Sequence, residues 1–297
     1  MRSLLKSKRK SLKKSVNNVS NTVKEARVWA SSFLEKQNRE PRVAELMLQH
    51  LLDVDLSEFL LKQQEELSDD VWLMYESWVM EHARTGKPLE HFTERATFYG
   101  REFWVNRDVL IPRPETEELI VAIMPHLHAG DVVVDIGTGS GIIALTIKKE
   151  MPSVRMLATD LSERALAVAK ENSEQLDAEA EFFEGNFLEP IRETGEVPDV
   201  IISNPPYIPE KERSELDATV LYDPEAALFA EENGLAAYRE IVEQVMQLRR
   251  LPRLVAFEIG YDQGESVPQL IKSNCPDAHV EVLQDINGKD RIVLWKN

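Results

Sequence analysis

Cysteine is almost absent from this sequence, because Cys275 is the only one among its 297 residues. A single cysteine excludes an internal disulfide framework and any metal site built from a cysteine cluster. Long apolar runs are also missing, and none reaches the roughly 20 residues that a membrane-spanning helix needs. We therefore expect a cytoplasmic protein in a reducing environment, with no metal cofactor and no membrane association.

Acids outnumber bases outside the first 27 residues, whereas those 27 residues carry nine Lys or Arg and a single acid. The whole chain has a formal net charge of −17, so the remainder carries about −25. Because neutralisation of phosphates by Lys and Arg supplies most non-specific affinity for nucleic acids, so acidic a body is a poor general nucleic-acid binder. Residues 1–22 lack the apolar core of a signal peptide, and their lysine-rich composition favours a basic, disordered tail over a transit peptide.

Apolar residues recur at three- and four-residue steps between residues 23 and 84, which predicts a small all-α helical bundle. Gly86 and Pro88 then break the helical pattern. The alternating segment at 96–105 predicts a β-hairpin, so we assign residues 85–112 to a linker that contains this hairpin.

The pattern changes in the remaining part, residues 113–297, where apolar runs alternate with helical stretches. This alternation is typical of a parallel α/β sheet with helices on both faces. The last two apolar runs are separated by Asn287 and Gly288, a strong turn dipeptide. The final strand is therefore expected to run antiparallel to its neighbour.

Glycines are few, 12 in all, and three of them stand in one short loop between an apolar run and a helical stretch. Glycines allow a sharp turn and a close approach of the backbone to a ligand. A dinucleotide fingerprint would need glycine at Ile142, and the lysine of a P-loop is missing. The loop consists of Asp135, Ile136, Gly137, Thr138, Gly139, Ser140 and Gly141.

The ends of the next two strands indicate the ligand. The second strand ends in Asp160, 23 positions beyond Gly137, where an acid can accept both hydroxyls of a ribose. Together with the acidic start of the loop and its three glycines, Asp160 predicts a site for S-adenosylmethionine. The third strand is expected to end in Asn186 and Phe187, which could pair with the adenine edge and cover its face. The alternative is a polar strand terminus beside a core phenylalanine.

The fourth strand leads into Asn204, Pro205, Pro206 and Tyr207. Ligands of a doubly wound sheet bind beyond the carboxyl ends of its strands, so this segment faces the same crevice as the glycine loop. The Asn204 side-chain oxygen and the Pro205 carbonyl can each accept one N–H of a planar amide or exocyclic amine, and the fixed φ of proline keeps that carbonyl aimed. Tyr207 would wall the target group and face its developing positive charge. The segment is therefore predicted to position a planar –NH2 group for methylation.

These motifs together resemble the peptide chain release factor glutamine N5-methyltransferases of the PrmC/HemK type. The resemblance extends from about residue 24 to 297 and rests on VLIPRPETEELI, NPPYIP, YDPEAALFAEENGLAAYREI, FEIGYDQ and NGKDRIVLW. It implies a seven-stranded class I S-adenosylmethionine-dependent methyltransferase domain of Rossmann-like fold, preceded by the small helical bundle and the β-hairpin linker.

The resemblance also implies a substrate, which is the glutamine of the Gly-Gly-Gln (GGQ) motif in class 1 release factors. S-adenosylhomocysteine would be the second product, the bundle would help to grip the release factor, and we expect a monomer. Asn204 to Tyr207 would contact the glutamine, while Arg113 and Glu115 match positions beside the donor pocket with a closing or structural role. The residues that would bind the methyl donor are Asp135, Gly137, Thr138, Gly139, Ser140, Gly141, Asp160, Asn186, Phe187 and Asn204.

Three departures from the family pattern leave fine detail open. Asn186 stands where the family usually has Asp, the fifth strand lacks its usual preceding glycines, and LFAEENGL lacks a glycine pair. The alternatives are a glutamine methyltransferase that acts on a ribosomal protein, a DNA or RNA adenine methyltransferase, and a non-catalytic adaptor that keeps the fold. The acidic body disfavours a nucleic-acid substrate, and the intact glycines, Asp160 and Asn204 disfavour the adaptor.

Overall fold

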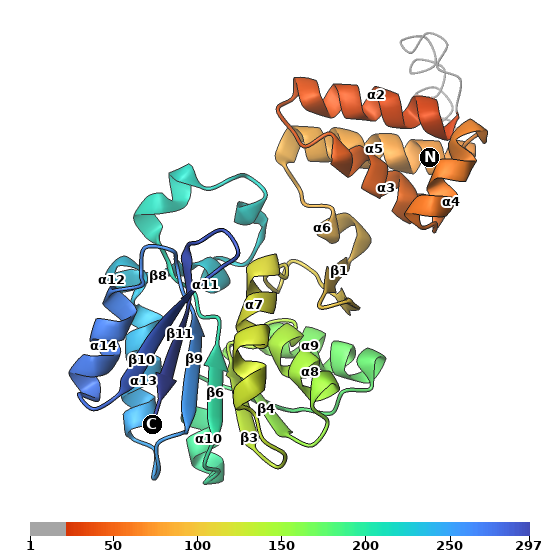
Figure 1. Ribbon diagram of the computed structural model, residues 1–297. Helices are drawn as coiled ribbons and strands as arrows, with labels where there is room; N and C mark the ends of the chain where they lie inside the picture. The colour runs from red at the N-terminus through yellow and green to blue at the C-terminus, as the bar shows by residue number, and fades with distance from the viewer. Residues whose placement is uncertain (1–21) are drawn as a thin grey trace. The chain divides into compact units, whose positions relative to one another are not determined.

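The computed structural model describes residues 22–297, and the chain divides into two units, one that ends at Thr93 and one that begins at Glu94 (Figure 1). The tail predicted for residues 1–22 lies outside the described residues apart from Thr22. No helix among the described residues is long and apolar enough to cross a membrane.

The first unit is a helical bundle in which three of the helices start at side-chain caps. Thr22 forms a capping box with Glu25 at the first helix, and Ser68 accepts a hydrogen bond from the backbone N–H of Val71. Gly86 adopts the left-handed conformation and ends the longest helix, as the break in the sequence pattern predicts. The helices are α2 (Val23–Lys36), α3 (Arg42–Leu52), α4 (Leu56–Leu61), the 3₁₀ turn η1 (Lys62–Gln64), α5 (Asp69–Thr85) and α6 (Glu90–Thr93).

Small and apolar side chains form the core of this bundle. Tyr75 of α5 is fully buried, and its hydroxyl donates to the carbonyl of Ala44 at 3.0 Å. Trp29, Trp72 and Trp78 are half-buried and pack against this core, and the rings of Trp29 and Trp72 lie 5.3 Å apart. The bundle therefore has its own hydrophobic core.

The second unit begins with the predicted hairpin, β1 (Arg95–Phe98) and β2 (Arg101–Trp104). Phe98 and Phe103 are buried against each other and against the helices that cover the large sheet. Asn172 bonds both backbone groups of Trp104 and also donates to the carbonyl of Ser140 at 2.9 Å. One buried amide thus joins the hairpin to the glycine loop.

The large sheet has seven strands in the order β10-β11-β9-β6-β3-β4-β5, which confirms the predicted α/β methyltransferase architecture. β11 runs antiparallel to both β9 and β10, and the other neighbouring pairs are parallel. Gly288, with φ of +74°, lies in the predicted turn before β11. The strands are β3 (Val132–Ile136), β4 (Arg155–Asp160), β5 (Glu181–Glu184), β6 (Val200–Ser203), β9 (Leu254–Glu258), β10 (His279–Gln284) and β11 (Asp290–Lys296).

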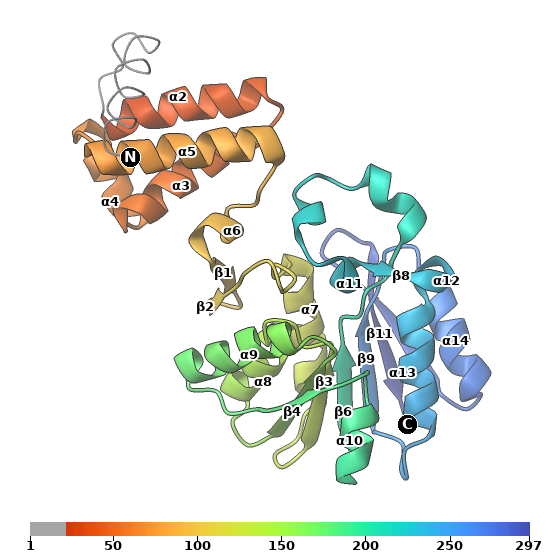
Figure 2. The same ribbon diagram turned by 180° about the vertical axis from the view of Figure 1, so that it is seen from behind.

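Helices cover both faces of the sheet (Figures 1 and 2). A separate hydrophobic core lies on each face of the sheet. Neighbouring residues of β3 alternate between these cores, since Val133 packs on one face and Val134 on the other. The first face is covered mainly by α7 (Pro114–Ile123), α8 (Ile142–Glu150) and α9 (Glu163–Leu176), and the second by α10 (Glu189–Thr194), α13 (Ala236–Met246) and α14 (Ser266–Asn274).

Short elements occupy most of the segment between β6 and α13. A small parallel sheet pairs β7 (Ile208–Pro209) with β8 (Phe229–Ala230). The remaining elements are η2 (Met124–His126), η3 (Glu210–Glu215), η4 (Val220–Tyr222), α11 (Glu225–Leu228) and α12 (Glu231–Gly234).

Candidate active site

The glycine loop is held against β4 by its own backbone. The N–H groups of Gly137 and Thr138 both donate to the carbonyl of Thr159, at 2.9 and 3.0 Å. Gly137 and Gly139 have positive φ, and a Cβ added at either would meet nothing within 4 Å. The backbone therefore borders open space at these two positions, which fits a loop that receives a ligand.

Asp135 ties the start of this loop to the helix that follows it. The side chain is fully buried. Its Oδ2 accepts hydrogen bonds from the Thr138 hydroxyl at 2.6 Å and from the N–H of Ala144 at 3.2 Å. Burial raises the pKa of Asp135 to about 7, although these bonds act to lower it. The second oxygen, Oδ1, has no hydrogen-bond partner among the described residues.

Asp160 contacts the loop from the next strand. Its two oxygens accept from the N–H groups of Gly139 and Ser162, both at 2.9 Å. Burial raises the pKa of Asp160, and the backbone hydrogen bonds partly counter that rise. Since each carboxylate oxygen can accept more than one hydrogen bond, the carboxylate keeps acceptor capacity for ribose hydroxyls.

The expected end of the third strand, at Phe187, is wrong by three residues. β5 ends at Glu184, so Asn186 and Phe187 lie in the turn after it, where Phe187 has φ of +49°. The Asn186 amide donates to a carboxylate oxygen of Glu240 on α13. The structure brings both residues to the edge where β3, β4 and β6 end, but by a turn instead of a longer strand.

Asn204 directly follows β6, which pairs with β3 so that Ser203 lies opposite Ile136. The next residues, Asn204 and Gly137, therefore leave adjacent strands at the same level. The Asn204 amide nitrogen, Nδ2, donates to the Thr116 hydroxyl at 3.2 Å. The sheet thus places the predicted methyl-acceptor segment beside the predicted donor loop.

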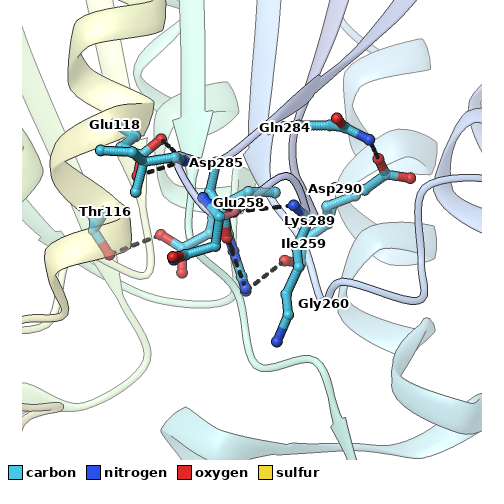
Figure 3. A network of polar contacts seen from close by, with 12 residues as sticks. Thr116, Glu118, Glu258, Ile259, Gly260, Gln284, Asp285, Lys289 and Asp290 are labelled. Atoms are coloured by element: carbon cyan, nitrogen blue, oxygen red, sulfur yellow. Dashed lines mark hydrogen bonds and ion pairs between the residues drawn. The ribbon is translucent and has the colours of Figure 1, made fainter.

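Thr116 in turn donates to Glu258 Oε2 at 2.7 Å (Figure 3). Both side chains are 1% exposed. Burial raises the pKa of Glu258 to about 7, against the lowering effects of the Thr116 hydrogen bond and the Arg291 charge. The Asn204 side chain also acts to lower the pKa of Glu258.

The β10–β11 turn holds the Arg291 guanidinium, whose charge acts on Glu258. Asp285 accepts from the backbone N–H of Lys289 at 3.0 Å and lies 3.4 Å from the Arg291 guanidinium. Arg291 also donates to the carbonyl of Ile259 at 3.2 Å. The turn is joined to α7, since the N–H of Ile286 donates to the Glu118 carboxylate.

Tyr207 is fixed through its backbone. Gln263 Nε2 donates to the carbonyls of Tyr207 and Gly234, both at 3.3 Å, while the Gln263 oxygen accepts from the N–H of Gly260. Burial raises the pKa of the Tyr207 phenol to about 12, so the phenol is neutral near pH 7. Pro205 is buried and Pro206 half-buried, so a rigid turn joins Asn204 to Tyr207.

A pocket of about 230 Å³ opens beside Asn204 and Tyr207. Arg113 forms an ion pair at 2.5 Å with Asp223, which is buried and also accepts from the N–H of Ile111. This pair joins the chain before α7 to the segment before α11. The pocket is lined by Leu110, Arg113, Glu115, Asn204, Tyr207, Ile208, Leu216, Val220, Ala227, Leu228, Glu258 and Arg291.

Relatives with known names match this chain over almost its whole length. A curated protein from Bacillus cereus called release factor glutamine methyltransferase is 42% identical over 278 residues, which cover 92% of this chain and 98% of the relative. The protein of the same name from Bacillus subtilis (strain 168) is 41% identical, with 92% and 96% coverage. The chain belongs to the release factor glutamine methyltransferase family. It is an S-adenosylmethionine-dependent glutamine methyltransferase.

Two family models match parts of the chain, and a solved structure shares its fold. Residues 25–93 match the PrmC N-terminal domain, and residues 115–232 match the Methyltransferase small domain. The hMettl16 catalytic domain, solved with the MAT2A 3'UTR hairpin 6, shares the fold with a TM-score of 0.53. It is 16% identical and covers 77% of this chain and 82% of its own.

Reasoning from sequence alone missed several polar residues of this methyltransferase site. Thr116, Asp223, Glu258 and Gln263 all stand inside the stretches that carry the family resemblance, but no role could be given to them. One signal was available, since Glu258 is the single charged residue at the end of the apolar strand β9. Arg113 and Glu115, expected beside the donor pocket, line the pocket beside Asn204 and Tyr207.

Proposed function

We propose that this protein transfers a methyl group from S-adenosylmethionine to the side-chain amide nitrogen (N5) of the glutamine in the GGQ motif of class 1 peptide chain release factors. The observation that carries the proposal is the pairing of Ser203 with Ile136. This pairing sets the Asn204–Tyr207 turn and the glycine loop side by side at the carboxyl edge of the sheet, where such sheets bind ligands.

The backbone of the glycine loop and the Asp160 carboxylate would hold S-adenosylmethionine, the methyl donor. S-adenosylmethionine, when bound, supplies a methyl group on a positively charged sulfur and leaves as S-adenosylhomocysteine. The open space before Gly137 and Gly139 accommodates it, and Asp160 accepts hydrogen bonds from the ribose hydroxyls. Phe187 covers the adenine face and Asn186 lies at its edge. Thr138 and Ser140 belong to the same loop, and Asp135 secures its start.

The acceptor half works by positioning. An amide nitrogen is a poor nucleophile because its lone pair is delocalised, so the lone pair must be aimed at the methyl carbon. Asn204 Oδ1 and the Pro205 carbonyl each accept one N–H of the glutamine. Such near-attack placement can lower a barrier by roughly 7–11 kcal/mol. As the new C–N bond forms, the bond between the methyl group and sulfur breaks, and one N–H proton then passes to water, which restores a neutral amide. Neutral Tyr207 faces the transient positive charge.

The proposed partner is a release factor, gripped in part by the N-terminal bundle. The net charge of −17 supports a protein substrate over direct nucleic-acid binding. We propose that the protein is a monomer. We propose a cytoplasmic location. The single cysteine supports it, because one cysteine cannot form an internal disulfide and disulfides are rare in cytosolic proteins.

The test is methyl transfer from labelled S-adenosylmethionine to a purified class 1 release factor. The matched substrate is the same factor with Ala in place of its GGQ glutamine. Label on the intact factor alone supports the proposal, whereas equal label on both factors, or label on neither, refutes it.

The Asn204→Ala variant tests the role of this residue in the same assay. We expect turnover to fall by about 100-fold or more, because the target amide loses one of its two acceptors. Donor affinity, measured by calorimetry, should change much less. An equal loss of turnover and donor affinity would contradict the role.

A further inference from the structure

Three buried or half-buried side chains from distant parts of the chain form one line of hydrogen bonds. Asn204 Nδ2 donates to Thr116 Oγ1 at 3.2 Å, and that hydroxyl donates to Glu258 Oε2 at 2.7 Å. Thr116 lies on α7, Glu258 ends β9, and Asn204 follows β6. The line therefore joins a helix and two strands at the pocket beside Asn204 and Tyr207, which we call the acceptor pocket.

The direction of these bonds determines which end of the Asn204 amide is bound. The Thr116 hydroxyl has a single proton, and Glu258 takes it. The hydroxyl oxygen is then only an acceptor toward Asn204, so it pairs with the amide nitrogen. A flipped amide would place two acceptor oxygens against each other, which leaves a buried polar group unpaired.

The bound orientation is also the one that the reaction needs. With Nδ2 turned to Thr116, the carbonyl oxygen of Asn204 remains available to accept an N–H from the target amide. In the flipped state, Asn204 would present N–H groups to an N–H group. A primary amide substrate would then lose one of the two acceptors that aim its lone pair.

We infer that Thr116 and Glu258 are positioning residues that lock the Asn204 side-chain amide with its oxygen toward the acceptor pocket. The catalytic consequence of this orientation rests on the proposed function. The fixed orientation of the Asn204 amide, which we call the lock, is a property of the protein without substrate.

A carboxylate fits the end of this line because, when ionised, it can only accept. Burial raises the pKa of Glu258 to about 7, so the measurements below are made at about pH 8, where the ionised form predominates. A protonated acid or an amide at position 258 could donate to Thr116 and so permit the reverse direction. The charged and titratable groups that act on Glu258 are Arg291, which favours its ionised form, and Glu115, which opposes it. Tyr207 shares the pocket, and Tyr238 donates to the Glu258 backbone carbonyl at 2.8 Å.

The lock can be tested by hydrogen exchange of the Asn204 side-chain amide, measured by NMR on protein labelled with ¹⁵N-asparagine. The Asn204→Ala variant assigns the signal by removing it. Thr116→Val keeps the side-chain shape without the hydroxyl, and we expect its Asn204 amide protons to exchange about five- to tenfold faster than in the unmodified protein. Thr116→Ser, which restores the hydroxyl, should return the exchange rate to within about twofold of the original.

Thr146→Val is a matched control. Thr146 lies on α8, is fully buried, and its hydroxyl has no hydrogen-bond partner among the described residues. The Thr146→Val substitution should leave the exchange rate of the Asn204 amide protons unchanged. Equal exchange in Thr116→Val and the unmodified protein, with both folded, would overturn the inference whether or not the release factor is the substrate.

The catalytic consequence is tested by kinetics on the release factor. Thr116→Val and Glu258→Gln should each lower kcat by about 10- to 100-fold, with donor affinity and the KM for release factor nearly unchanged. The double variant should be little worse than the worse single variant, because one line is already broken. Full turnover in either single variant, or equal losses in Thr116→Val and Thr116→Ser, would overturn the positioning role. Inactivity of the unmodified protein would refute the proposed function and leave the exchange result to decide the lock.

Discussion

Gly234 offers a way to displace the acceptor turn without touching any residue of it. This glycine ends α12 with φ of +86°, and an added Cβ would lie 2.1 Å from the Tyr207 carbonyl oxygen and 2.7 Å from Gln263 Nε2. Gln263 holds the carbonyls of both Tyr207 and Gly234. The Gly234→Ala substitution must therefore push the backbone of Tyr207 away and break this clamp.

The expected size of the effect follows from the overlap. A carbon and a carbonyl oxygen approach each other to about 3.3 Å, so the added methyl group requires a movement of about 1 Å. A misplacement of about 1 Å in a positioned reaction can cost about 100-fold in rate. The positive φ adds a separate cost of about 1–2 kcal/mol to the folded state. We expect kcat for release factor methylation to fall by about 100-fold.

The matched control separates the two costs. Gly195 caps α10 with φ of +79°, and a Cβ added there would meet nothing within 4 Å. Gly195→Ala should lose similar stability in urea unfolding but keep turnover near that of the unmodified protein. Donor binding by calorimetry should survive in both variants, because the glycine loop is held by β4. The reasoning is refuted if Gly234→Ala loses no more turnover than Gly195→Ala, or loses donor binding in parallel.

The remaining predictions concern three carboxylates. Asp160→Asn should weaken donor binding by about 10- to 100-fold, since it removes the charge from two hydrogen bonds worth about 1.5–3 kcal/mol each; unchanged affinity in calorimetry would refute the ribose assignment. Burial raises the pKa of Asp135 to about 7, so between about pH 4 and 7 the folded chain keeps a proton there that the unfolded chain releases. The free energy of unfolding should therefore decrease as the pH rises through this window, and Asp135→Asn should flatten that slope in urea titrations; an unaltered slope contradicts the assignment. Asp223→Asn removes the charge that pairs with Arg113 and should raise the KM for release factor several-fold while the donor Kd stays the same; an unchanged KM would mean that this pair does not shape the acceptor pocket.

The donor half of the site could be predicted because its residues are close together in the chain. A strand, a glycine loop and a helix follow one another from Val132 to Glu150, and Asp160 ends the next strand. Local pattern is enough to recognise such a unit, since parallel strands joined by helices place their carboxyl ends at one edge. The same rule predicted that Asn204 lies at that edge, although no contact of Asn204 was known.

The acceptor half could be predicted only in part because its supports are far apart in the chain. Thr116 and Glu258 are separated by 142 positions, and Gln263 reaches back 56 positions to Tyr207. A sequence pattern carries no distance between such residues. Each of them also has an ordinary alternative, since a threonine on a helix or a glutamine near a helix start is common on protein surfaces.

Asn186 shows a third kind of limit, in which the pattern was extended too far. The segment from Glu181 to Phe187 reads as one strand because phenylalanines favour strands. Gly185 and the positive φ of Phe187 turn the chain out of the sheet after Glu184. The turn brings Asn186 to Glu240 on α13, a neighbour beside which a second carboxylate would be repelled. An asparagine at this position, where the family usually has an acid, is consistent with that neighbour.

The two halves of the site are therefore built in different ways, and this difference governs how each responds to change. The donor half is mostly backbone, with Gly137 and Thr138 bonded to β4, so most side-chain substitutions there leave the loop in place and act through affinity. The acceptor half depends on side chains that converge from α7, β9 and the segment after β9. Thr116, which donates to Glu258, accepts from the Asn204 amide, and Gln263 donates to the Tyr207 carbonyl. Because that turn acts by orientation, loss of a supporting side chain should appear in kcat before it appears in the binding of either substrate.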